Sequence, residues 1–135
     1  MSDRPFLDTN ILIYAFATGD PRKPAAERVM ARGGAISVQV LNEFVHVSHR
    51  KLGLGWVEIA KRIDTVKALV DPPAALTHDI HVAACDIARR RKIAFYDALI
   101  VASALSAKCD VLLTEDFQAG AKFGTLEVRN PFAAL

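Results

Sequence analysis

Four acidic residues in this sequence interrupt or adjoin apolar segments, where a carboxylate is costly unless it is hydrogen-bonded, paired or bound to a metal ion. Asp8 stands inside FLDTNILIYAF, and Asp116 follows the apolar run VLL. Asp97 opens the segment DALIVASAL, and Glu43 lies in the middle of VLNEFVHV. If these carboxylates converge, they repel one another, so that some of their pKa values rise or a cation binds. The four residue types therefore point to a site for a hard divalent cation.

The cation that suits such a site is Mg²⁺ or Mn²⁺, because both prefer oxygen ligands, keep some of their water and take further oxygens from a substrate phosphate. The chemistry that this permits is hydrolysis of a phosphodiester, in which the metal orients a water molecule and offsets charge on the leaving oxygen. Thr9, Asn10 and Thr114 lie near two of the acids in the sequence. They are candidates to donate the hydrogen bonds that hold the carboxylates in place.

Each acid, taken alone, also has an ordinary structural explanation. Asp8 and Asp97 stand where an aspartate is favoured as a helix N-cap. Asp116 fits a turn, and Glu43 lies on a polar helical stripe that is typical of a face exposed to solvent. For any single acid these alternatives stay open, and only the combination of the four favours a metal site.

Short apolar segments alternate with helical patterns along the chain, which predicts a parallel sheet covered by helices on both faces, a three-layer α/β/α sandwich. If the strands that precede Asp8 and Asp116 are neighbours, the two carboxylates lie at one edge of the sheet, where such folds bind ligands. The expected strands are 4–7, 35–38, 74–76, 111–113 and 126–129. The expected helices are 11–17, 24–32, 38–52, 56–70, 97–107 and one that is capped by Thr77 and ends in the basic run 89–92.

At 135 residues the chain is long enough to bury a core and is expected to form a single domain, 1–135. Its 17 basic and 15 acidic residues give a net charge of +2, which is too even to indicate a class of partner by itself. Two cysteines without a secretory signal predict a reduced protein of the cytoplasm. No apolar run reaches the length of a membrane span, so no membrane association is expected.

The segments FLDTNILIYA, LNEFVHV, FYDALIVASAL and LLTEDFQAG resemble, in this order, the four acidic blocks of PIN-domain nucleases, over practically the whole chain. The similarity is closest to the VapC-type toxins of bacterial and archaeal toxin–antitoxin modules. This resemblance implies a PIN fold with about five strands in the order 3-2-1-4-5. It also implies an endoribonuclease that depends on Mg²⁺ or Mn²⁺, forms a homodimer and is blocked by a cognate antitoxin.

The resemblance further implies that Asp8, Glu43, Asp97 and Asp116 are the catalytic and metal-binding residues, with Asp8 and Asp97 as the surest ligands. The spacing after the apolar run VLL favours Asp116 over its neighbour Glu115. Two other functions remain alternatives to a toxin. One is a solitary PIN-type nuclease that processes RNA, and the other is a PIN-like domain that binds RNA or a partner without cutting. The four intact acids argue against the second alternative.

Two groups of basic residues are candidates for contacts with RNA phosphates. One is the run Arg89, Arg90, Arg91 and Lys92, and the other is the pair Arg22 and Lys23. The run also fits a structural role, because cations at the C-terminus of a helix complement the helix dipole.

Overall fold

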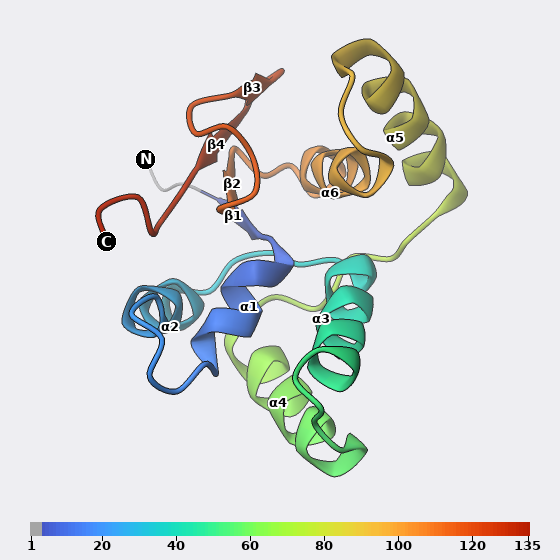
Figure 1. The fold of residues 1–135 in the computed structure, drawn as a ribbon. Helices are drawn as coiled ribbons and strands as arrows, with labels where there is room; N and C mark the ends of the chain where they lie inside the picture. The colour runs from blue at the N-terminus through green and yellow to red at the C-terminus, as the bar shows by residue number, and fades with distance from the viewer. Residues whose placement is uncertain (1–3) are drawn as a thin grey trace.

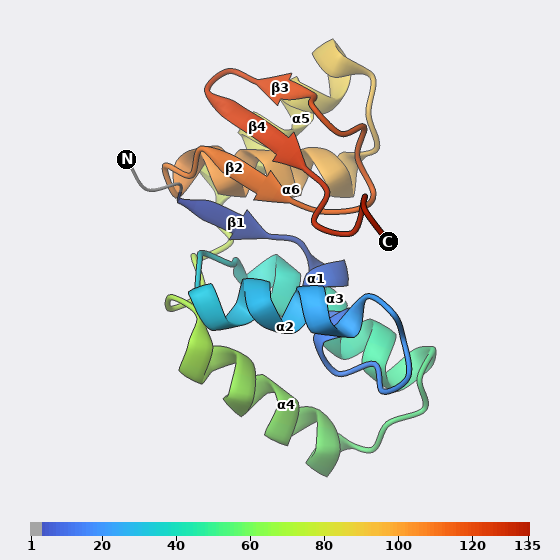
Figure 2. The same ribbon diagram turned by 90° about the vertical axis from the view of Figure 1, so that its left-hand side faces the viewer.

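The computed structural model describes residues 4–135, and residues 1–3, which the predicted domain 1–135 includes, lie outside the described residues. The sheet has four strands in the order β1-β2-β4-β3 (Figures 1 and 2). Strands β1 (Pro5–Leu7), β2 (Val111–Leu113) and β4 (Leu126–Arg129) run parallel to one another. Strand β3 (Lys122–Phe123) pairs antiparallel with β4 and was not predicted.

The prediction of an α/β fold with a largely parallel central sheet is confirmed, but the sheet has four strands where about five were expected. The expected strands 35–38 and 74–76 are reduced to two isolated parallel bridges. Ala35 bridges to β1, and Ala74 bridges to Ser37. Outward from β1 the two segments therefore keep the expected order 3-2-1, although neither is a named strand.

Local chemistry explains why these two segments stay short. Ser37 already begins the next helix, because its hydroxyl accepts a hydrogen bond from the backbone N–H of Val40 at 3.2 Å. The segment before Ala74 contains Pro72 and Pro73, which have no backbone N–H to donate to a neighbouring strand. Each segment can therefore extend the sheet by only a residue or two.

The helices of the described chain form two groups in Figure 1, with α5 beside α6 and with α1 packed against α2 and α3. Helices α1 and α6 begin two residues earlier than predicted, at Thr9 and Phe95. Asp97 therefore lies inside the first turn of α6 and not before it. Among residues 4–135, no helix is long and apolar enough to cross a membrane. The helices are α1 (Thr9–Ala15), α2 (Lys23–Arg32), α3 (Val38–Arg50), α4 (Trp56–Leu69), α5 (His78–Arg91) and α6 (Phe95–Ser106).

One hydrophobic core joins the sheet to both groups of helices. Helix α6 is apolar almost all round, as predicted, and every residue from 98 to 104 is buried. Phe6 and Leu7 at the end of β1 and Ile11 and Leu12 in α1 are completely buried. These contacts fix the ends of the elements that carry the acidic residues, because a buried side chain of this size stabilises its position by about 1.5–3 kcal/mol.

Candidate active site

The carboxyl ends of β1 and β2 meet at one edge of the sheet, because Leu7 and Leu113 are in register. The residues that follow them are Asp8 and Thr114. The backbone N–H of Asp8 donates to the carbonyl of Leu113 at 3.1 Å, so the chain leaves the sheet with Asp8 beside Thr114. This is the edge of an α/β sheet at which ligands bind.

The Asp8 carboxylate is buried, with 4% of the residue exposed, and is held from both sides. One of its oxygens accepts from the backbone N–H of Thr9 at 2.7 Å, and the other accepts from the hydroxyl of Thr114 at 2.8 Å. Asp8 is also the N-cap of α1, so the capping interpretation and the buried carboxylate are both realised. Burial raises the pKa of Asp8 to about 6 against the effect of these hydrogen bonds, and the charges of Asp116 and Glu43 act in the same direction as burial.

Thr114 and Asn10 connect Asp8 to Asp116. The Thr114 hydroxyl accepts from the side-chain amide of Asn10 at 3.1 Å and from the backbone N–H of Asp116 at 3.0 Å. The same amide nitrogen of Asn10 donates to the Asp116 carboxylate at 3.1 Å. Asp116 is exposed, so this carboxylate is held in place while one side of it stays open to a ligand.

Glu43 approaches the same edge from α3. Its two carboxylate oxygens accept from the Thr9 hydroxyl at 2.9 Å and from the side-chain amide of Gln39 at 3.2 Å. The residue is half-buried, so the polar stripe of α3 is not simply a face exposed to solvent. The contact between Thr9 and Glu43 joins the start of α1 to the middle of α3 across the site.

Asp97 lies in the first turn of α6, whose N-cap is Ala94, so Asp97 does not cap the helix. Its carboxylate forms no hydrogen bond or ion pair within residues 4–135. Burial raises the pKa of Asp97, and the charges of Asp116 and Glu43 raise it further. Asp97 is therefore close enough to the other acids to be affected by them, and it is not neutralised by a protein cation.

An open cleft of about 270 Å³ lies at the end of β1 and β2, and two of the four acids, Glu43 and Asp116, line it. In the part of the chain that the structure describes, no Lys, Arg or His forms an ion pair with any of them. Several negative groups therefore lie near one another without a positive partner, which favours the binding of a cation. The cleft is lined by Thr9, Asn10, Ile13, Tyr14, Glu43, Val47, Glu115 and Asp116.

The side chains at this edge fit a hard divalent cation. The acids offer oxygen ligands only, and the side-chain carbonyl oxygen of Asn10 is buried without a hydrogen-bond partner, which leaves one more acceptor unsatisfied. Among the described residues, no three acidic, histidine or cysteine side chains lie close enough together to hold an ion by themselves. This agrees with Mg²⁺ or Mn²⁺, which are typically bound by one or two carboxylates and complete their shells with water and substrate oxygens.

Glu115, the neighbour of Asp116, belongs to a separate network that sequence reasoning missed. It accepts a hydrogen bond from the hydroxyl of Tyr14 and pairs with Arg22 at 3.3 Å. Arg22 also pairs with Asp20 at 2.8 Å, and its guanidinium lies 3.7 Å from the centre of the Tyr14 ring. No local spacing could have revealed this network, because about a hundred residues separate Glu115 from Tyr14.

Four of the six basic residues that were predicted to contact RNA, Arg22, Lys23, Arg89 and Arg90, form ion pairs with other acids, and within residues 4–135 none of the six pairs with the four acids of the site. Lys23 pairs with Glu27 at 3.1 Å. Two arginines of the run 89–92 pair with Asp86 at 2.8 and 3.0 Å, and the guanidinium of Arg91 lies 4.1 Å from the centre of the Phe123 ring. The run stands at the C-terminal end of α5, where cations stabilise the helix. A contact with RNA stays a prediction for both groups.

The sequence model of the PIN domain family matches residues 6–121 of this chain. The chain belongs to the PIN domain family. No curated protein sequence matches it with significance.

Several solved structures share the fold. The toxin–antitoxin complex from Klebsiella pneumoniae contains a chain with 23% identity and a TM-score of 0.69, and the alignment covers 95% of this chain and 98% of that one. VapC20 of Mycobacterium tuberculosis, a toxin that cleaves the sarcin–ricin loop, has 21% identity and a TM-score of 0.66 over 80% of this chain and 86% of that one. VapBC2 of Rickettsia felis, solved with a DNA fragment of its promoter, contains a chain with 19% identity and a TM-score of 0.67, over 93% of this chain and 97% of that one. At these identities the similarity shows a common fold, that of toxin–antitoxin PIN domains.

Proposed function

We propose that this protein is a metal-dependent endoribonuclease in which Asp8, Glu43, Asp97 and Asp116 are the catalytic residues. The observation that carries the proposal is the grouping of these four carboxylates at one edge of the sheet without a protein cation. Burial and the charges of Asp116 and Glu43 raise the pKa of both Asp8 and Asp97, so the cluster is short of positive charge. A substrate phosphate, which is itself negative, can approach such a cluster only together with a metal ion.

Asp8 and Asp97 would hold Mg²⁺ or Mn²⁺ most directly, and Asp116 and Glu43 would complete its surroundings and help to position water. When bound, the metal would activate a water molecule for attack on the phosphodiester and offset the charge on the leaving oxygen. The protein's own contribution is positioning. Thr114 holds an oxygen of Asp8 at 2.8 Å, and hydrogen bonds of this kind fix the orientation of metal-binding carboxylates.

Asn10 and Thr9 position the remaining acids. Asn10 donates to the Asp116 carboxylate and the backbone N–H of Asp116 donates to Thr114, so the loop after β2 cannot turn Asp116 away without breaking both contacts. Thr9 donates to Glu43 and sets its carboxylate beside the cleft. Asp97 is unpartnered and can turn toward a ligand. The arrangement offers three carboxylates with fixed orientation, Asp8, Asp116 and Glu43, and one with freedom to adjust, Asp97.

The test is cleavage of a structured RNA by the wild-type protein and by Asp8→Asn and Asp97→Asn, with Mg²⁺ or Mn²⁺ and with EDTA. Asp64→Asn is the matched control, because Asp64 is exposed on α4 and lies outside the site. The wild type and the control should cleave only with metal, and the two site variants should lose at least about a hundredfold in rate, as is typical when a transition-state contact is removed. Equal activity in all four proteins would refute the assignment.

We also propose that the protein acts as the toxin of a toxin–antitoxin pair, as a homodimer that a cognate antitoxin blocks. This is supported by the similarity in fold to chains solved as toxin–antitoxin complexes. Expression of the wild type should arrest growth, Asp97→Asn should not, and co-expression of the protein encoded by the neighbouring reading frame should restore growth. Active nuclease without growth arrest would instead favour a solitary RNA-processing enzyme. Light scattering at micromolar concentration tests the dimer.

A further inference from the structure

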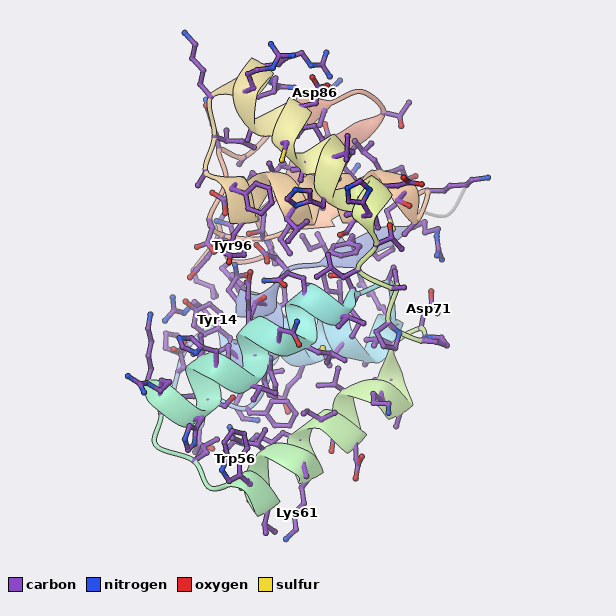
Figure 3. The ribbon with its side chains drawn as sticks, turned by 90° about the vertical axis from the view of Figure 1, so that its right-hand side faces the viewer. Tyr14, Trp56, Lys61, Asp71, Asp86 and Tyr96 are labelled. Carbon is purple, nitrogen blue, oxygen red and sulfur yellow. The ribbon has the colours of Figure 1, made fainter. Side chains whose placement is uncertain are left out.

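A second and larger groove of about 510 Å³ lies between α3 and the start of α6. Helix α3 contributes one of its faces, since the lining residues stand at positions i, i+3, i+4, i+7 and i+8. Tyr96 forms the other wall, and Figure 3 shows its side chain in the region between α6 and α3. The lining residues are Gln39, Asn42, Glu43, His46, Val47 and Tyr96.

This groove is continuous with the acidic cleft. Glu43 and Val47 line both of them, and Tyr96 is the residue immediately before Asp97. A polymer whose phosphodiester lies among the four acids would therefore have a neighbouring unit within reach of the groove. The position of the groove favours a part of the substrate over an unrelated small molecule.

The chemistry of the lining selects which part of a nucleic acid fits. In the described chain no Lys or Arg lines the groove, and Glu43 does, so a second phosphate is disfavoured there. Tyr96 is 63% exposed, although large aromatic side chains are usually buried, and its ring is supported edge-on by Phe95 at 5.6 Å between centres. An exposed, supported ring offers a surface on which a base can stack. Asn42 and His46 carry donors and acceptors that can meet the edge of a base.

We propose that this groove binds one unpaired nucleobase of the RNA, next to the phosphodiester that is cleaved, with Tyr96 stacked on the base. The inference rests on the proposed nuclease function and adds a base-binding subsite to it. A base inside an A-form duplex is already stacked and paired, whereas single-stranded loops and ends present bases that can be turned out. The base that stacks on Tyr96 is therefore one that is turned out of any helix.

The experiment compares Tyr96→Leu and Tyr96→Phe with the wild type on a short single-stranded RNA, on the same strand in a duplex, and on strands with one abasic position. Trp56→Leu is the control. Trp56, at the start of α4, is also an exposed aromatic residue, but its ring stacks on His49 of α3 and does not line the groove. The loss of one stacking contact predicts a kcat/KM about tenfold lower for Tyr96→Leu, mainly through KM. Tyr96→Phe and Trp56→Leu should match the wild type.

The abasic strands separate a stacking role from a structural one. At one position beside the cleaved bond, removal of the base should cost the wild type about the same factor as Tyr96→Leu, and should cost Tyr96→Leu nothing further. Binding of the same strands with Mg²⁺, measured by fluorescence anisotropy on proteins that also carry Asp97→Asn, gives a readout that does not depend on cleavage. There the Kd should rise about tenfold for Tyr96→Leu, and only for strands that carry the base.

The proposal is overturned if Tyr96→Leu equals the wild type, if its loss is the same on every abasic strand, if the duplex is cleaved as well as the single strand, or if no protein binds the strand. A wild type that binds with this dependence on Tyr96 but does not cleave would refute the nuclease function and leave the base site standing. A wild type that cleaves RNA but whose binding does not depend on Tyr96 would refute the base site and leave the nuclease function standing.

Discussion

Replacement of Asp8 by asparagine should stabilise the metal-free protein at neutral pH, although it removes a hydrogen-bonded side chain. The pKa of Asp8 lies at about 6, above its ordinary value of 3.8, chiefly because the carboxylate is buried. At about 1.4 kcal/mol per pH unit, this difference corresponds to roughly 3 kcal/mol of stability lost when the folded protein must carry the charge. The amide of Asp8→Asn carries no charge and avoids that cost.

The sign follows from proton binding. Between about pH 4 and pH 6 the folded state holds a proton on Asp8 that the unfolded state has already released, so the free energy of unfolding falls as the pH rises through this range. The amide accepts from only one of the two donors, Thr9 and Thr114, which costs about 1 kcal/mol at every pH. Asp8→Asn should therefore be more stable than the wild type by about 2 kcal/mol at pH 8 and less stable by about 1 kcal/mol at pH 4.

Urea unfolding in EDTA, followed by far-UV circular dichroism at pH 4, 6 and 8, measures these differences. Asp64→Asn controls for the loss of one negative charge at the surface, and its difference from the wild type should stay within about 0.5 kcal/mol at each pH. The reasoning is refuted if the difference between Asp8→Asn and the wild type is the same at pH 4 and pH 8. It is also refuted if Asp8→Asn is the less stable protein at pH 8.

Three further outcomes follow from the same geometry. Saturation with Mn²⁺ should raise the melting temperature in a thermal scan, since a ligand at a hundred times its Kd stabilises the folded state by about 2.7 kcal/mol. The absence of any shift at millimolar metal would contradict a preformed site. Thr114→Val should lower the free energy of unfolding by about 1–3 kcal/mol, and by more at pH 8 than at pH 4, because the buried Asp8 carboxylate loses its donor; equal losses at both pH values would contradict this. Gly34→Ala should lower the free energy of unfolding by more than about 1 kcal/mol, because φ at Gly34 is 147° and the new Cβ would lie 2.9 Å from the carbonyl oxygen of Pro5. Gly53→Ala, which has open space around it, should cost less when both variants are measured by urea unfolding.

Local patterns in the sequence were sufficient to predict most of the elements. The apolar run 111–113 became β2, the apolar segment after Asp97 became the buried part of α6, and Thr77 caps α5 as expected. The predicted strands at 35–38 and 74–76 were too long. Hydrophobicity indicates that such segments are buried, but it does not say how many residues have a free N–H and a neighbour with which to pair.

The interpretation of single acids was less secure for the same kind of reason. Asp97 looked like a helix cap because the apolar segment begins after it, but α6 begins at Phe95 and leaves its carboxylate unpartnered. Glu43 looked like a residue of a solvated face, since the sequence cannot show that Thr9 lies opposite it. Glu115 and Asp116 are adjacent in the sequence, which does not show that Glu115 binds the distant Tyr14 and Arg22. These contacts separate Glu115 from the four acids.

The sequence by itself determined the fold class and singled out the four acids as candidates, because apolar periodicity and the residues at the ends of strands are local properties of the chain. The tertiary structure decided how these acids affect one another. Strand register brings Asp8 beside Thr114, packing of α1 against α3 brings Thr9 to Glu43, and burial raises the pKa of Asp8. The groove beside Tyr96 likewise exists only once α3 and α6 are in place, since desolvation and shape depend on neighbours that are distant in the sequence.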